Sequence, residues 1–110
     1  MSDVIDAAVF RELQATAGAD FVAELVDTLL EEAPGMLSAL RQAAAAGDAD
    51  AFRRAAHSLK SNSLTFGATE LAAAARALEL GGISSEAAVD ALQSAYDAAA
   101  QRLKELRDAA

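Results

Sequence analysis

The chain has 110 residues, a net charge of −8 and no cysteine, and hydrophobic residues make up 54% of it. This length fits one domain, and the absence of cysteine excludes disulfides, thiol nucleophiles and cysteine-bound metals. The acidic balance disfavours nucleic acid as a partner, because a phosphate backbone requires a basic surface. We see no leader pattern and no apolar run near the ~20 residues that span a bilayer, so we expect a cytoplasmic protein without membrane contact.

The first two helices are predicted from hydrophobic spacing and capping residues. Only one proline and six glycines interrupt an alanine-rich chain, which favours an all-α fold. A first helix spans about Asp6–Thr16 and ends at Gly18. A second begins at Asp20, a good N-cap, and ends at Gly47, and we expect Pro34 to kink it rather than split it. Its predicted hydrophobic stripe has alternating spacings of four and three residues: Val22, Val26, Leu29, Ala33, Met36 and Leu40.

A third helix follows Asp48, a predicted N-cap, and is closed by Gly67, which can take the left-handed conformation. This helix carries His57, the only histidine in the chain. Its predicted buried seam recurs at helical spacing: Phe52, Ala56, Leu59, Ser63 and Phe66.

Two further helices complete the chain. The fourth spans about Thr69–Leu80 and ends at the glycine pair 81–82, and the fifth starts with Ser84 or Ser85 as its cap. Short links between long amphipathic helices imply antiparallel neighbours. We therefore expect an up-down antiparallel four-helix bundle with a short N-terminal lid helix, in which residues 1–110 form a single domain and a monomer.

The predicted surroundings of His57 are polar and cationic. On a wheel of about 100° per residue, His57 lies at the edge of the buried seam and is expected to reach solvent. Its neighbours one and two turns away are Arg53, Lys60, Ser61 and Leu64. A local cationic spot on an acidic chain indicates an anionic partner group at that place.

Glu79 is a candidate partner for the imidazole. His57 stands ten residues before Gly67 and Glu79 twelve residues after it, so the two lie at similar heights on adjacent antiparallel helices. Glu79 would then accept a hydrogen bond from Nδ1–H and leave Nε2 free as a nucleophile. The alternative is that Glu79 pairs with Arg76, one turn earlier on its own helix.

Phosphoryl acceptance fits these residues better than other chemistry. A metal site is disfavoured because no second histidine or cysteine exists, and a serine hydrolase would need a nucleophile turn and an oxyanion hole. A neutral imidazole at His57 can attack phosphorus, while Lys60 offsets the charge of the phosphoryl oxygens and Ser61 leaves room for them. No glycine-rich nucleotide loop is present, so the phosphoryl group is expected from another protein domain.

The segment around His57 resembles the histidine phosphotransfer (Hpt) family of two-component phosphorelays. Ser61 departs from that pattern, because glycine is usual at its position. The matching positions in this chain are His57, Leu59, Lys60, Gly67, Ala68, Leu78 and Glu79.

The resemblance implies that His57 is phosphorylated, that Lys60 stabilises the phosphoryl group and that Glu79 orients the ring. It implies a phosphocarrier without its own ATP-binding site rather than an enzyme, and no cofactor. The implied partners are response-regulator receiver domains, each with its own aspartate and Mg²⁺, and a hybrid sensor kinase. The residues predicted to dock the partner are Arg53, Arg54, Ser61 and Leu64.

An alternative hypothesis is a non-catalytic helical interaction module that binds a regulator without phosphotransfer. It requires binding that survives replacement of His57. The sequence identifies neither the phosphodonor nor the acceptor, and it leaves open whether the chain stands alone or belongs to a larger kinase.

Overall fold

The computed structural model describes residues 4–83 and 85–109, and its regular secondary structure there is entirely helical. The predicted all-α class is confirmed for this part of the chain. No helix within it is both long and apolar enough to cross a membrane. The helices are α1 (Ala7–Ala17), α2 (Ala19–Ala46), α3 (Ala49–Thr65), α4 (Thr69–Gly81) and α5 (Glu86–Ala109).

Side-chain caps begin three of the helices. Asp6 Oδ1 accepts from the amide of Ala8 at 3.0 Å at the start of α1. Asp48 Oδ1 accepts from the amide of Ala51 at 3.0 Å at the start of α3, as predicted. The Ser85 hydroxyl accepts an N–H at 3.3 Å from the first turn of α5, while Ser84, the other predicted cap, lies outside the described residues.

The predicted cap of α2 at Asp20 is wrong. The helix begins at Ala19, directly after Gly18, whose φ of 93° turns the chain between α1 and α2. Asp20 therefore lies inside the first turn, where its negative charge still interacts favourably with the positive end of the helix dipole.

Helix α2 continues without a break through Pro34 and ends at Gly47, which has the left-handed φ of 69°. The prediction that Met36 is buried is wrong, because Leu37 occupies that place in the core and Met36 is half-buried at the edge. Leu37 lies four residues after the buried Ala33 and Met36 lies three residues after it. Four is closer than three to the helical period of about 3.6 residues.

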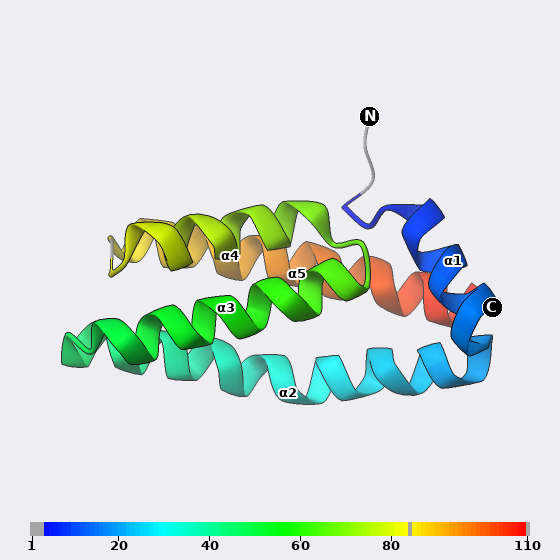
Figure 1. The fold of residues 1–110 in the computed structure, drawn as a ribbon, viewed down its shortest axis with the longest axis horizontal. Helices are drawn as coiled ribbons and strands as arrows, with labels where there is room; N and C mark the ends of the chain where they lie inside the picture. Colours follow the sequence, from blue (N-terminus) through cyan, green and yellow to red (C-terminus); the bar gives the residue numbers. More distant parts are fainter. Residues whose placement is uncertain (1–3, 84, 110) are drawn as a thin grey trace.

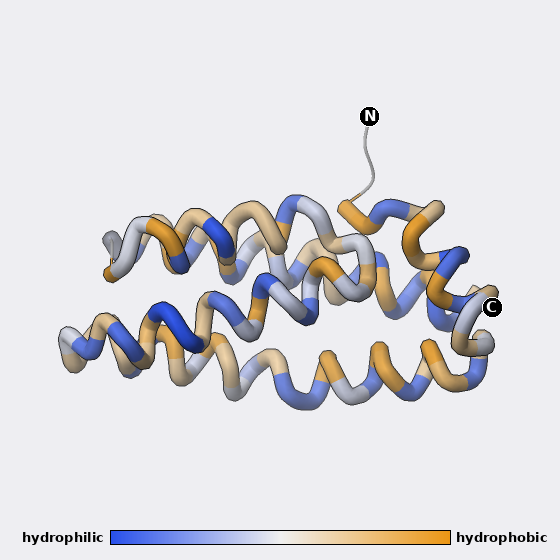
Figure 2. The backbone as a smooth tube through the Cα atoms, viewed as in Figure 1, coloured by the Kyte–Doolittle hydropathy of each residue, from blue (hydrophilic) through white to orange (hydrophobic). Residues whose placement is uncertain are grey.

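Each of the four long helices packs against two others. Helices α2 and α4 each contact both α3 and α5, and α1 contacts α2. Figure 1 shows successive long helices running in alternating directions, with α1 at the end where α2 begins and α5 ends. In Figure 2, hydrophobic and hydrophilic residues alternate along every helix, which is typical of helices that bury one face.

The core-facing side of α3 fixes how this helix is rotated. All residues of its predicted seam are buried, from Phe52 to Phe66. The buried hydroxyl of Ser63 donates to the carbonyl of Leu59 at 2.5 Å, so it leaves no unsatisfied polar group in the core. With this face inward, the opposite face of α3 is directed to solvent.

Gly67 shapes the turn between α3 and α4. Its φ is 74°, and a Cβ atom added there would lie 3.0 Å from Cβ of Val9 and 3.1 Å from the carbonyl oxygen of Asp6. The amide of Asp6 donates to the carbonyl of Gly67 at 2.8 Å. The turn therefore requires glycine for two reasons, its left-handed backbone and the close approach of the chain that enters α1.

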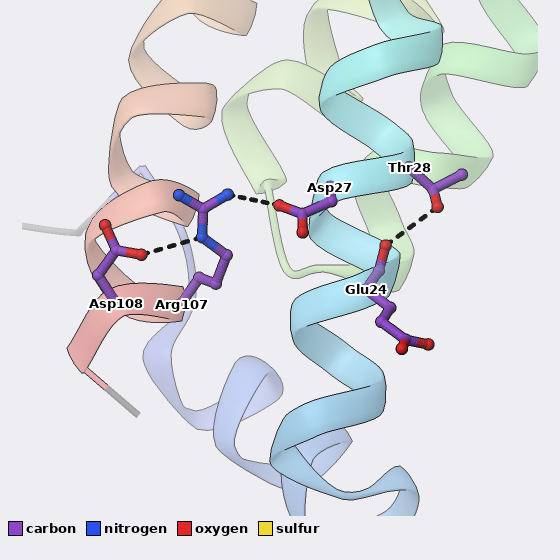
Figure 3. Close-up of polar contacts among 5 residues, drawn as sticks. All are labelled: Glu24, Asp27, Thr28, Arg107 and Asp108. Atoms are coloured by element: carbon purple, nitrogen blue, oxygen red, sulfur yellow. Dashed lines mark hydrogen bonds and ion pairs between the residues drawn. The ribbon is translucent and has the colours of Figure 1, made fainter.

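An ion pair links the end of α5 to α2 (Figure 3). Arg107 donates to Asp27 of α2 at 2.5 Å and to its neighbour Asp108 at 3.0 Å. On the same stretch of α2, the hydroxyl of Thr28 donates to the carbonyl of Glu24 at 3.0 Å. Exposed ion pairs of this kind contribute little to stability, so the packed apolar faces dominate it.

Two leucines of α3 provide a matched test of how this helix is rotated, because Leu59 faces the core and Leu64 faces solvent. Leu59→Ala should lower the free energy of unfolding by about 2–5 kcal/mol, because it opens a cavity in the core. Leu64→Ala should change it by less than about 0.5 kcal/mol, because Leu64 is 56% exposed whereas Leu59 is 1% exposed. Urea denaturation measures both, and equal losses would show that α3 is rotated differently.

Candidate functional site

Three polar side chains meet between α3 and α4. His57 and Lys60 come from α3, and Glu79 comes from α4. The side chain of His57 is 58% exposed, while those of Lys60 and Glu79 are 23% and 14% exposed. The histidine therefore faces solvent above a carboxylate that is largely covered.

The carboxylate of Glu79 binds both residues of α3. Its Oε1 accepts a hydrogen bond of 2.6 Å from Lys60 Nζ, and its Oε2 is in hydrogen-bond contact with His57 Nδ1. Because an ionised carboxylate can only accept, Nδ1 must carry the proton in the neutral ring, and Nε2 keeps its lone pair. The predicted juxtaposition of His57 and Glu79 is confirmed. The cation that binds Glu79 is Lys60 of α3, in place of Arg76, the alternative partner considered from the sequence.

These contacts hold Glu79 in its charged form. The hydrogen bond from Lys60 first, and then the one from His57, lower the pKa of Glu79 below its ordinary value of 4.5, and partial burial opposes them only in part. At neutral pH, therefore, a negative charge stands behind the imidazole, where it favours any positive charge that develops on the ring.

The bond between Lys60 and Glu79 was not predicted from the sequence. The sequence suggests an exposed lysine that acts only through its position near His57, whereas the structure shows a half-buried amine tied to the neighbouring helix. The sequence did contain a signal for this bond, because a residue three positions after His57 lies on the same side of the helix and can reach the same residue of the neighbouring helix.

The predicted docking residues all lie on α3, around or beyond His57. Arg53 is exposed and forms a long ion pair of 3.8 Å with Asp50. Arg54 and Ser61 are also exposed, and Leu64 is a large exposed hydrophobic residue. The exposed face of α3 thus presents one imidazole among cationic, small and apolar side chains.

The arrangement suits a nucleophile or proton acceptor rather than a metal centre. Among residues 4–83 and 85–109, no group of three or more His, Asp or Glu side chains is placed to hold a metal ion. What the site offers to a ligand from solvent is the lone pair of His57 Nε2, with a lysine ammonium close by.

Comparison with known proteins gives one match. A family model described as Hpt domain matches residues 24–109, a stretch that includes His57, Lys60 and Glu79 and leaves α1 outside. Searches of curated proteins and of solved structures find no match.

The ionised carboxylate has a consequence for stability at low pH. The pKa of Glu79 is lower in the folded chain than its ordinary value. The ionised carboxylate therefore stabilises the folded chain at pH values above the ordinary pKa, and this stabilisation is lost as the pH falls through the pKa of the folded state. The stability difference between the wild type and Glu79→Gln should therefore shrink on acidification from about pH 7 to about pH 3.

Urea denaturation of both proteins at several pH values measures this difference. Glu31→Gln is the matched control, because Glu31 is exposed on α2 without an ion pair within the described chain. A Glu79→Gln effect that stays constant at every pH would contradict the assignment of an ionised Glu79.

Proposed function

Because the chain belongs to the histidine phosphotransfer (Hpt) domain family, we propose that it is a phosphorelay intermediate in which His57 is phosphorylated. Hpt domains are phosphotransfer modules of two-component signalling, are carriers rather than catalysts, and interact with receiver domains and kinases. The observation that carries the proposal is the exposed imidazole whose Nδ1 is held by Glu79, so that Nε2 is free.

In the proposed step, His57 Nε2 attacks the phosphorus of an aspartyl phosphate on a receiver domain. The N–P bond forms as the O–P bond breaks, and the electron pair of the broken bond stays on the aspartate carboxylate. The proton remains on Nδ1, so the ring becomes a cation that the Glu79 carboxylate stabilises. Attack by the aspartate of a second receiver reverses the step and returns the neutral ring.

Lys60 would stabilise the transferred phosphoryl group. Its ammonium has three N–H donors, and one of them is used by Glu79, so two remain for phosphoryl oxygens. Transfer of this kind depends mainly on positioning and on neutralising the oxygens. Glu79 therefore positions both groups, one through each carboxylate oxygen.

The proposal includes the finer architecture and the partners. We assign the four long helices to an up-down antiparallel four-helix bundle with α1 as a short lid, supported by their alternating directions and by the contacts of each with two others. The partners would be response-regulator receivers, which carry the Mg²⁺ of the reaction, and a hybrid sensor kinase. A single domain over residues 1–110, a monomer and a cytoplasmic location stay predictions.

Partner docking is assigned to the exposed face of α3. Arg53 and Arg54 would steer the anionic phosphorylated site of the receiver. Ser61, one turn after His57, leaves space for the phosphoryl group, and Leu64 adds an apolar contact two turns away. This assignment is supported by the exposure of all four side chains around His57.

Incubation with a receiver domain carrying labelled phosphate and Mg²⁺ tests the transfer. The wild type should acquire acid-labile label on Nε2 of the histidine, as ³¹P NMR can identify, and His57→Gln should acquire none. The unfolding midpoint of His57→Gln should match that of the wild type, because the ring is exposed. Binding of the receiver without any label on the wild type would favour the non-catalytic interaction module instead.

The two lysines of the chain provide a second test. Lys60→Ala should slow phosphotransfer about tenfold or more, because it removes a positive charge from the phosphoryl oxygens. Lys104→Ala removes the same charge from the exposed surface of α5 and should leave the rate unchanged. Rapid-quench measurement of labelled protein gives both rates, and equal rates would refute the role of Lys60.

A further inference from the structure

Ser61 carries a hydroxyl that the packing of the chain does not use. Hydroxyls inside helices commonly donate to the carbonyl four residues earlier, and those of Ser63 and Thr65 on α3 do so. The side chain of Ser61 is exposed, and its hydroxyl has no hydrogen-bond partner among residues 4–83 and 85–109. The O–H of Ser61 is therefore available to a group from outside the chain.

The hydroxyl of Ser61 lies beside the imidazole of His57. Residues four positions apart on a helix have Cβ atoms about 5–6 Å apart and share one side of the helix. Side chains of an α-helix lean toward its N-terminus, so the side chain of Ser61 leans toward the turn that carries His57. A group bound to the ring thus comes within reach of this hydroxyl.

Lys60 and Ser61 flank His57 on opposite sides. At about 100° per residue, Lys60 lies about 60° around the helix from His57 in one direction, and Ser61 lies about 40° from it in the other. Lys60 is on the side of α4, because its Nζ donates to Glu79. Ser61 is therefore on the side of His57 that faces away from α4.

The orientation of the ring directs its reactive nitrogen to the side of Ser61. His57 Nδ1 is directed to Glu79 on α4, and the two nitrogens of an imidazole ring point in nearly opposite directions, so Nε2 points away from α4. A phosphoryl group on Nε2 has three oxygens that accept hydrogen bonds. Lys60 would reach these oxygens from the side of α4, and Ser61 would reach them from the other side.

We propose that the Ser61 hydroxyl binds the phosphoryl group of phosphorylated His57 by donating a hydrogen bond to one of its oxygens. The hydroxyl keeps its proton, and no covalent bond changes at Ser61. This inference rests on the proposed function and adds a second donor to Lys60. It also gives a role to the departure from the Hpt pattern, because glycine at this position leaves space but has no side-chain donor.

Competition for phosphoryl groups tests the proposal. Wild type and Ser61→Ala are mixed in equal amounts with Mg²⁺, limiting phosphoramidate and a trace of a receiver domain that exchanges phosphoryl groups between them. At equilibrium, the wild type should hold about threefold to tenfold more phosphoryl groups than the variant, because only its phosphorylated form gains the hydrogen bond. Mass spectrometry at neutral pH separates the two proteins by the mass of one oxygen atom.

The equilibrium distribution separates phosphoryl binding from partner docking. A change in how Ser61 contacts the receiver alters the rate of exchange but not the final distribution. The unfolding midpoint of Ser61→Ala should not fall below that of the wild type, because the side chain is exposed and alanine is the better helix former.

Two control variants identify the hydroxyl as the cause. Ser94→Ala makes the same change on the exposed surface of α5 and should share phosphoryl groups equally with the wild type. Ser61→Gly should hold fewer phosphoryl groups than the wild type, as Ser61→Ala does. If residue 61 only leaves space, the glycine variant will hold as many as the wild type or more, and the proposal is overturned.

The ³¹P NMR signal of phosphorylated His57 reports the contact directly. Its chemical shift should differ between Ser61→Ala and the wild type and should be the same in Ser94→Ala and the wild type. If wild type and Ser61→Ala share phosphoryl groups equally, the role of Ser61 is refuted while the phosphocarrier function stands. If the wild type acquires no phosphoryl group at His57, the phosphocarrier function itself fails.

Discussion

The bridging of two α3 side chains by one α4 carboxylate is the interaction on which the site depends. Glu79 accepts from Lys60 with one oxygen and contacts His57 Nδ1 with the other. Both contacts help to prepare the histidine, because the hydrogen bond from Lys60 lowers the pKa of Glu79 and the ionised carboxylate fixes the tautomer of the ring. The reactive nitrogen is exposed, while the groups that prepare it are largely covered.

This bridge requires a fixed register between α3 and α4. The rise along a helix is about 1.5 Å per residue, so a slip of one or two residues would separate His57 from Glu79 by more than a hydrogen bond allows. The left-handed turn at Gly67 and the buried seam of α3 hold the two helices at the required height and rotation. Much of the fold thus serves to place two residues that lie 22 positions apart.

The sequence predicts those features that local rules determine. The caps at Asp48 and Ser85 follow from the need of first-turn amides for an acceptor, and the heights of His57 and Glu79 follow from helix rise and a tight turn. The prediction failed at Asp20, because a turn at Gly18 lets α2 begin directly at Ala19.

Other features depend on tertiary packing. The burial of Leu37 rather than Met36 depends on how α2 is rotated against its neighbours, which a spacing rule leaves uncertain by one residue. The bond from Lys60 to Glu79 depends on the distance between two helix axes. That distance is set by the side chains packed between the helices and cannot be read from either segment alone.

The attachment of α1 has a consequence for how the chain tolerates mutation. The bond from the amide of Asp6 to the carbonyl of Gly67 uses main-chain atoms only, so any residue with an N–H can make it, and only proline at position 6 removes the donor. Position 67, by contrast, requires glycine, because its φ is positive and an added Cβ atom would lie too close to Val9 and Asp6. This main-chain contact therefore constrains the residue type at position 67 far more than at position 6, where the side chain has a separate role as the cap of α1.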